Sequence, residues 1–285
     1  MNRNLQAMVV NQRGPVTGVF RMRDAVLGET KTGRMYLRVR LEDMSGGLNA
    51  YAWREESYRD LYIQDWSRVY VEGQLRRHHN MPCIDLCKLS SQVQKEWGQV
   101  VRLIPQSLCP LSWLLPQLQA AVSRITIEPL ARFVEAVLSN DAIAFPFVSA
   151  PASLNHHHNY PGGLLMHSLE CFQMVERYRE FPRESYELGL VSALFHDVGK
   201  TLTMTHDMQR TSLGYHVEHE KLNFEILGPY LSRLDKVWPQ GANELRYLLN
   251  WKLHRRAPWY NMADLVACCD RVSTGLDMQK RLKVA

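Results

Sequence analysis

The chain has 285 residues, of which 46% are hydrophobic and 22% charged, and its formal net charge is +5. These values are typical of a globular protein with one large domain or two ordinary ones. No apolar run approaches the roughly 18–20 residues of a membrane helix, and the N-terminus lacks the pattern of a signal peptide, so a membrane partner is not expected. Six scattered cysteines without CxxC spacing favour a reduced, cytoplasmic compartment.

Short alternating segments dominate the first 92 residues. Met35–Asp43 alternates apolar and polar side chains strictly, and Leu48–Trp53 does so again after a glycine-rich turn. Three further strands are predicted at residues 16–23, 68–75 and 83–89. Five short strands in this length predict a small closed β-barrel, and the leading candidate is the OB-fold.

The polar faces of these strands carry aromatic residues interleaved with arginines. Aromatic rings stack on bases and guanidinium groups bind phosphates, so this pattern suits single-stranded nucleic acid. The segment "RRHHN" lies between the last two strands, where many OB barrels hold a ligand. The alternative is that Tyr and Arg are ordinary residues of exposed strands. The predicted nucleic-acid contacts are Tyr36, Arg38, Arg40, Tyr51, Trp53, Arg76 and Arg77.

From Pro105 onward the apolar spacing lengthens to helical periods, with prolines and glycines between the segments. Seven helices are predicted, at residues 111–125, 128–140, 163–180, 185–200, 219–234, 242–256 and 261–276. We therefore expect an all-α domain over residues 105–285, joined by a linker of residues 93–104 to a barrel domain of residues 1–92.

The segment "LVSALFHDVGKTLT" is almost wholly apolar until His196 and Asp197. A buried carboxylate is costly unless it has a partner. Imidazole and carboxylate groups together are ligands for a divalent transition metal, which would neutralise such a carboxylate. A lone histidine on an apolar face is usually a core residue, but several such groups in different helices favour a metal site. The further candidates are His167, His216, His219, His254 and Asp270.

The order His167, His196-Asp197, Asp270 resembles the H…HD…D pattern of the HD-domain metal-dependent phosphohydrolases. The segment "APASLNHHHNYPGGLLMHSLE" resembles the one that opens the catalytic domain in YhaM-type 3′→5′ exoribonucleases, which also place an OB-fold before the HD domain. A similar segment occurs in the HD domain of TraI-type conjugative relaxases. The family's second histidine-rich motif often carries two adjacent histidines, whereas here Arg255-Arg256 follows His254.

The resemblance implies a centre for one or two divalent ions that bind a phosphodiester and activate water. Asp197 would bridge the two ions, and the second ion would take either His216 or His219. Ligands of mixed imidazole and carboxylate type suit Mn²⁺ in the first place, with Fe, Co, Ni or Mg as alternatives. The full implied ligand set is His167, His196, Asp197, His216, His219, His254 and Asp270.

Other residues near these motifs are candidates for substrate contact. Lys200 follows the HD pair by one helical turn and could bind a phosphate oxygen, or it could be a solvated lysine at a helix end. The loop "NHHHNY" could line the substrate entrance or have no role. The predicted catalytic residues are Asp197, Lys200, His157 and His158, and further predicted strand contacts are Arg255 and Arg256.

The leading hypothesis is a metal-dependent nuclease for single-stranded RNA or DNA. The resemblance implies that it works as a 3′→5′ exonuclease and releases nucleoside 5′-monophosphates. The first alternative is an HD phosphohydrolase for a nucleotide or signalling nucleotide, which would not need the barrel. The second is a nucleic-acid-binding conjugation module with a structural metal. No sequence pattern indicates whether RNA or DNA is preferred, and none indicates the oligomeric state.

Overall fold

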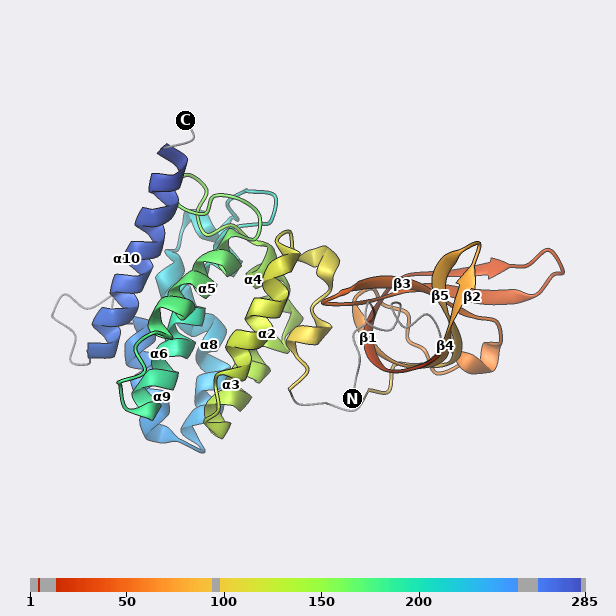
Figure 1. Ribbon diagram of the computed structural model, residues 1–285, viewed down its shortest axis with the longest axis horizontal. Coiled ribbons are helices and arrows are strands. Elements are labelled where there is room, and N and C mark those ends of the chain that lie inside the picture. The colour runs from red at the N-terminus through yellow and green to blue at the C-terminus, as the bar shows by residue number, and fades with distance from the viewer. Residues whose placement is uncertain (1–4, 6–13, 94–97, 251–260, 283–285) are drawn as a thin grey trace. The chain divides into compact units, whose positions relative to one another are not determined.

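The computed structural model describes residues 5, 14–93, 98–250 and 261–282. The chain divides into two compact units, Met1–Ser107 and Leu108–Ala285. The first unit is a closed β-barrel and the second is built from helices (Figure 1). The predicted fold class, a five-stranded barrel followed by an all-α region, is therefore confirmed.

The barrel closes in the order β1-β2-β3-β5-β4, and β4 pairs with β1. All neighbouring strands are antiparallel except β3 and β5, which run parallel. This arrangement is consistent with the predicted OB-fold. The strands are β1 (Gly14–Glu29), β2 (Met35–Asp43), β3 (Gly46–Ala52), β4 (Ser67–His78) and β5 (Met81–Ser90).

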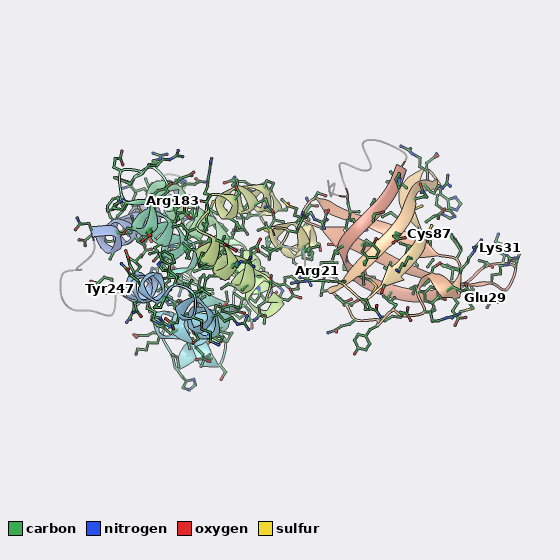
Figure 2. All side chains as sticks on the ribbon, turned by 90° about the horizontal axis from the view of Figure 1, so that it is seen from below. Arg21, Glu29, Lys31, Cys87, Arg183 and Tyr247 are labelled. Carbon is green, nitrogen blue, oxygen red and sulfur yellow. The ribbon has the colours of Figure 1, made fainter. Side chains whose placement is uncertain are left out.

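The predicted alternation places apolar side chains inside the barrel. In β2, Leu37, Val39 and Leu41 are fully buried, while the residues between them face outward. Glu29 and Lys31 lie at the end of the β1–β2 hairpin (Figure 2). The barrel therefore has a mainly apolar interior and an outer surface rich in polar side chains.

The β4–β5 hairpin contains the "RRHHN" segment. His78 pairs with Met81, so the loop has two residues, and both have positive φ (48° at His79, 64° at Asn80). Two consecutive positive φ angles define a type I′ turn, whose twist matches that of the flanking strands. The turn fixes the register of the hairpin and presents the histidines at its tip.

Residues 98–107 belong to the first unit, although their sequence has neither a strand nor a helix period. Arg102 in the 3-10 helix η2 (Val101–Leu103) is 5% exposed, and its guanidinium donates to the Val19 carbonyl over 2.7 Å. The same group lies 3.9 Å from Asp43, a fully buried carboxylate, and over the Phe20 ring. Through Arg102, this segment therefore places a positive charge beside the buried carboxylate of Asp43.

The second unit contains nine of the α-helices that the structure describes. They are α2 (Leu115–Ser123), α3 (Glu128–Leu138), α4 (Asp141–Ser149), α5 (Gly163–Val175), α6 (Arg183–Phe195), α7 (Lys200–Thr203), α8 (His219–Asp235), α9 (Pro239–Asn250) and α10 (Asn261–Leu282). The remaining 3-10 helices are η1 (Glu55–Ser57), η3 (Gln106–Leu108), η4 (Ser112–Leu114) and η5 (Leu213–Tyr215). None of the described helices combines the length and apolar character needed to cross a bilayer.

Helix α4 is absent from the predicted helices, because prolines are expected between the helical segments and this segment contains Pro146. The proline lies within the helix, and the Asn140 side chain caps its N-terminus by accepting from Ala142 N. The buried side chains of Phe147 and Val148 hold the helix in place despite the lost backbone hydrogen bond. Tertiary packing has here overridden a local breaker.

Helix α6 ends at Phe195 rather than at the predicted residue 200. Asn223 of α8 holds the intervening turn, since its side chain donates to the His196 carbonyl over 2.5 Å and accepts from Gly199 N over 2.7 Å. A Cβ at position 199 would lie 2.0 Å from the His219 carbonyl oxygen, so only glycine fits there. The turn places the HD pair at the end of α6, and α7 begins at Lys200.

Replacement of Arg102 by Ala should destabilise the barrel by about 3 kcal/mol, because Asp43 loses its buried cation. Hydrogen exchange of barrel peptides in the full chain, read by mass spectrometry, would measure this change. Arg132→Ala on α3 is the control, since its ion pair with Glu128 is exposed and should contribute about 0.5 kcal/mol at most. An Arg102 variant with wild-type exchange would contradict the expectation.

Candidate metal centre

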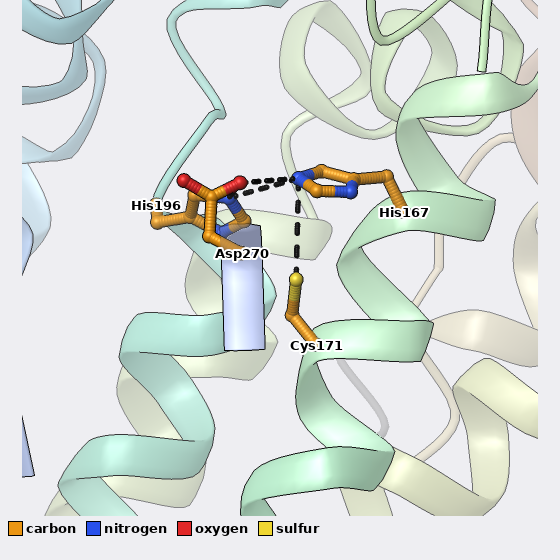
Figure 3. A group of neighbouring side chains, drawn as sticks. All are labelled: His167, Cys171, His196 and Asp270. Carbon is orange, nitrogen blue, oxygen red and sulfur yellow. Dashed lines mark hydrogen bonds and ion pairs between the residues drawn. The ribbon is translucent and has the colours of Figure 1, made fainter. Parts of the chain in front are cut away.

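Side chains from α5, α10 and the turn after α6 converge inside the helical unit (Figure 3). The Nε2 atom of His167 lies 3.0 Å from Asp270 Oδ1 and 3.2 Å from His196 Nε2. His196 Nε2 is 3.6 Å from the same Asp270 oxygen. Three residues that are far apart in the sequence thus direct ligand-type atoms at one point.

Asp197 lies beside this group and is 2% exposed. Its Oδ2 is 3.6 Å from His167 Nε2 and 3.4 Å from His196 Nε2, and it accepts from Lys200 Nζ over 2.6 Å. Its Oδ1 lies 3.2 Å from His219 Nε2. The buried carboxylate is therefore surrounded by three imidazoles and one ammonium group.

The donor atoms fit a divalent ion. The two imidazole nitrogens lie 3.0–3.6 Å from each other and from the carboxylate oxygens. Ligands held about 2.1 Å from one ion are separated by similar distances. Nitrogens and oxygens that face each other so closely need positive charge between them, and either a proton or a metal ion can supply it. Mixed imidazole and carboxylate donors are typical of Mn, Fe, Co, Ni and Zn sites.

The electrostatics of the cluster favour the metal-binding protonation states. Burial lowers the pKa of His167 to about 4, so its imidazole is neutral at pH 7, the form that binds metals. Burial alone would raise the pKa of Asp270, but hydrogen bonds with His167 and His196 outweigh it and hold the pKa well below its usual range. Neutral imidazoles and ionised carboxylates are thus both available.

Cys171 is a residue of this cluster that the sequence reasoning missed. It lies one helical turn after His167 on α5, is fully buried, and its Sγ is 3.9 Å from His167 Nε2. The ligand atoms of His167, Cys171, His196 and Asp270 all lie within 4.8 Å of one another. Cys171 could have been found from the sequence, because a residue four positions after the candidate ligand His167 lies on the same face of the helix.

The structure separates the two histidines that the sequence left as alternatives. His219 opens α8 and its Nε2 reaches Asp197, whereas exposed His216 lies after η5 with Nδ1 2.8 Å from the Ser212 carbonyl. His219 is therefore the one placed beside the cluster. His254, the other ligand implied for a second ion, lies outside the described residues.

The histidine loop packs against the cluster. His158 is 1% exposed and has a φ of 44°, and its carbonyl fits only because residue 163 is glycine: a Cβ there would be 2.0 Å away. The His157 ring centroid lies 4.9 Å from that of His167. Burial and the charge of Lys200 lower the pKa of His157 to about 3. Its buried Nε2 has no hydrogen-bond partner among the described residues.

A cleft of about 510 Å³ opens next to these groups. Lys200 and His219, which both contact Asp197, line it together with His157. Arg210, whose guanidinium lies over the Tyr215 ring, forms another part of the wall. The volume lies within the range of small-molecule sites. A ligand in this cleft would contact cations and a neutral imidazole beside the cluster.

The predicted aromatic residues of the barrel do lie together. Tyr51 and Trp53 are stacked with centroids 5.5 Å apart, and Tyr36 is 5.2 Å from Trp53. His78 at the end of β4 adds a ring 5.9 Å from Tyr51. These four residues form what we call the aromatic patch. The Tyr36 ring rests on Gly28 of the paired strand, where a Cβ would be 2.6 Å from it.

The predicted arginines differ in their surroundings. Arg38 is exposed and pairs with Tyr51 in the β2–β3 register. Arg40 instead forms an ion pair with Glu42 over 3.0 Å. Arg76 lies 3.8 Å from Asp85, whose other oxygen accepts from Trp53. Two further predictions concern Arg77, which is exposed near the hairpin tip, and the pair Arg255 and Arg256, which lies outside the described residues.

Replacement of His219 by Ala should weaken Mn²⁺ binding at least tenfold, because an imidazole beside Asp197 is lost. His216→Ala is the matched control: it removes a histidine of the same cleft whose ring is turned to a backbone carbonyl, and binding should be unchanged. Isothermal titration of both variants with Mn²⁺ would test this, and equal loss in both would contradict the assignment of His219.

No protein-family model matches the chain. Distant relatives bear the name 3′-5′ exoribonuclease YhaM. The one from Listeria innocua is 17% identical over 191 residues, which cover 67% of this chain and 60% of that protein. The one from Oceanobacillus iheyensis is 18% identical over 205 residues, 70% of this chain and 64% of that protein. The one from Bacillus velezensis is 19% identical over 244 residues, 84% and 76% respectively. The chain spans about 60% of the length of the first of these relatives.

Proposed function

We propose that the chain is a metal-dependent nuclease that shortens single-stranded nucleic acid from its 3′ end. The observation that carries this proposal is the convergence of His167, His196, Asp197 and Asp270 beside a cleft lined by cations. The name shared by the distant relatives supports a nuclease and supports the 3′→5′ direction. We assign the catalytic part to an HD domain of residues 105–285 and strand binding to a barrel domain of residues 1–92.

The metal centre would hold one or two divalent ions. His167, His196, Asp197 and Asp270, whose side chains lie together, would hold the first ion, and His219 with Asp197 would contribute to a second. A divalent ion held by these residues would supply Lewis-acid chemistry for the phosphodiester and a nucleophilic water at neutral pH. Mn²⁺ is the first choice for these donors, with Fe, Co, Ni and Mg as alternatives.

The residues of the cleft would bind and orient the phosphodiester. Lys200 compensates the charge of Asp197 with one N–H, and its remaining N–H groups can donate to a phosphate oxygen. His157 offers a neutral imidazole with a buried, unsatisfied Nε2 next to the centre. Because buried polar atoms are costly without partners, a bound substrate is a suitable partner for this nitrogen.

The barrel would hold the part of the strand that is not being cut. Exposed rings can stack on bases without regard to sequence, and Trp53 in the aromatic patch is 42% exposed. Exposed Arg38 adjoins the patch and suits a phosphate. Neither feature distinguishes ribose from deoxyribose, so both RNA and DNA are proposed substrates.

The product follows from the bond that is broken. If water attacks phosphorus and the 3′ oxygen of the preceding nucleotide leaves, the phosphate remains on the 5′ side of the released nucleotide. Cleavage from a 3′ end then gives nucleoside 5′-monophosphates. Continued binding of the 5′ portion by the barrel would favour stepwise trimming.

A second candidate function is hydrolysis of a free nucleotide. The cleft of about 510 Å³ has room for a molecule of that size. The aromatic patch favours the nuclease, because a nucleotide hydrolase has no use for a stacking surface on a separate unit. The same distinction applies to a conjugation module that binds strands without cutting them, since that function has no use for the ligand set.

Replacement of His196 or Asp197 by Ala should lower hydrolysis at least a thousandfold, since each removes a proposed ligand. A 5′-labelled single strand with Mn²⁺ would be followed on a gel, where the wild type should give a descending ladder. His206→Ala, which removes an exposed histidine, should behave as wild type after identical purification. Wild-type rates in either site variant would refute the metal centre, and rapid cutting of a circular strand would refute exonuclease action.

Replacement of Tyr51 by Ala should weaken binding of a single strand about 5- to 150-fold, as expected for loss of one stacking platform. Arg38→Ala should reduce the salt dependence of binding, with a change of about 0.7 in the slope of log affinity against log salt. Fluorescence anisotropy at several salt concentrations would measure both. Tyr62→Ala serves as control, because Tyr62 is 71% exposed in the same unit and lies outside the aromatic patch. An unchanged affinity in Tyr51→Ala would count against strand binding by the patch.

A further inference from the structure

One face of α10 carries a polar stripe that continues beyond the proposed ligand Asp270. Ser273, Asp277 and Lys280 follow it at intervals of three, four and three residues, which places all four side chains on the same side of the helix. Ser273 is fully buried and Asp277 is 9% exposed. Burying polar groups is unfavourable unless each finds a partner, so the partners of this stripe indicate what it does.

The partners of Ser273 lie on α5. Its Oγ donates to Glu170 Oε2 over 2.6 Å and lies 2.9 Å from His167 Nδ1. The same Glu170 oxygen is 3.2 Å from His158 Nε2. A continuous series of polar contacts therefore runs from the proposed ligand His167 to a residue of the histidine loop.

The direction of each hydrogen bond follows from the position of His167 Nε2. This nitrogen faces Asp270 and His196 and is therefore the ligand atom in the proposed centre. A nitrogen that binds a metal ion carries no proton, because its lone pair is used for the metal. The proton of the His167 ring is then on Nδ1 and is donated to the Ser273 oxygen, and the serine must use its own proton for Glu170. Hydrogen bonds from His158 and Ser273 outweigh the effect of burial and lower the pKa of Glu170, which therefore accepts as a carboxylate.

The far end of the series fixes the loop that lines the cleft. The backbone N–H of His158 donates to Asp277 Oδ2 over 2.7 Å, and its ring contacts Glu170. Both the main chain and the side chain of this buried residue are therefore held by the α10 stripe and its partner. The adjoining residue His157 lines the cleft.

We propose that Ser273, Glu170 and His158 are positioning residues that set the tautomer and orientation of His167 and join the cleft loop to the metal centre. Partners that accept the second imidazole N–H of a metal ligand raise metal affinity 10- to 100-fold in known sites. Because linkage is reciprocal, metal binding should in turn stabilise the loop. This inference rests on the proposed metal centre.

The test is Mn²⁺ affinity, measured by isothermal titration on the full chain at pH 7.5. Ser273→Ala and Glu170→Gln should each bind Mn²⁺ about 10- to 100-fold more weakly. The double variant should lose little more than Ser273→Ala alone, because both changes interrupt one series. Ser168→Ala is the matched control: this serine is next to His167 and fully buried, but its Oγ has no partner among the described residues.

Hydrogen exchange of loop peptides gives a second readout. Mn²⁺ should protect residues 152–162 in the wild type, and this protection should be reduced in Glu170→Gln at saturating Mn²⁺. Wild-type affinity in folded Ser273→Ala and Glu170→Gln, or equal weakening in Ser168→Ala, would overturn the positioning role alone. Absence of Mn²⁺ binding by the wild type would overturn the metal centre together with it.

Discussion

The helical unit depends on a carboxylate that is almost completely removed from water. Asp197 is 2% exposed, and its energetic cost is offset by Lys200 and by three imidazoles directed at it. These groups come from separate helices, so the packing of α5, α7 and α8 is linked to the charge balance of one residue. The proposed metal centre, the cleft wall and the break between α6 and α7 are all located within this arrangement.

The buried charges of the barrel and its aromatic patch are formed by different residues. Buried charge is concentrated around Asp43 and Glu42, which are matched by Arg102, Arg23 and Arg40. The aromatic patch is formed by Tyr36 of β2, Tyr51 of β3, Trp53 just after β3 and His78 at the end of β4, whose rings contact each other. A strand bound there would meet aromatic rings together with the exposed side chains of Arg38, Arg76 and Arg77. This combination suits binding that depends weakly on base identity.

Much of the fold and part of the site could be predicted from local patterns. Period-two alternation identified the barrel, and isolated polar residues in apolar helices identified three side chains, His167, His196 and Asp270, that the fold brings together. Features that depend on distant residues were missed. Helix α6 ends early because Asn223 holds the turn, residues 98–107 join the barrel through Arg102, and Cys171 gains its neighbours only when α5 meets α10. The sequence could not decide whether His216 or His219 lies beside Asp197, because two residues three positions apart share one face of a helix.

The two hydrogen bonds of the Asn223 side chain restrict which residues at position 223 can hold the turn between α6 and α7. One side-chain amide donates to the His196 carbonyl and accepts from Gly199 N, so it needs both functions at once. Aspartate has the same shape but cannot donate when ionised, and leucine can do neither. Spontaneous deamidation of Asn223 would therefore produce a chain of nearly unchanged mass. The turn between α6 and α7 would then lack the hydrogen bond to the His196 carbonyl. A chemical change at Asn223, which is not one of the proposed ligands, would thus loosen the turn that positions His196.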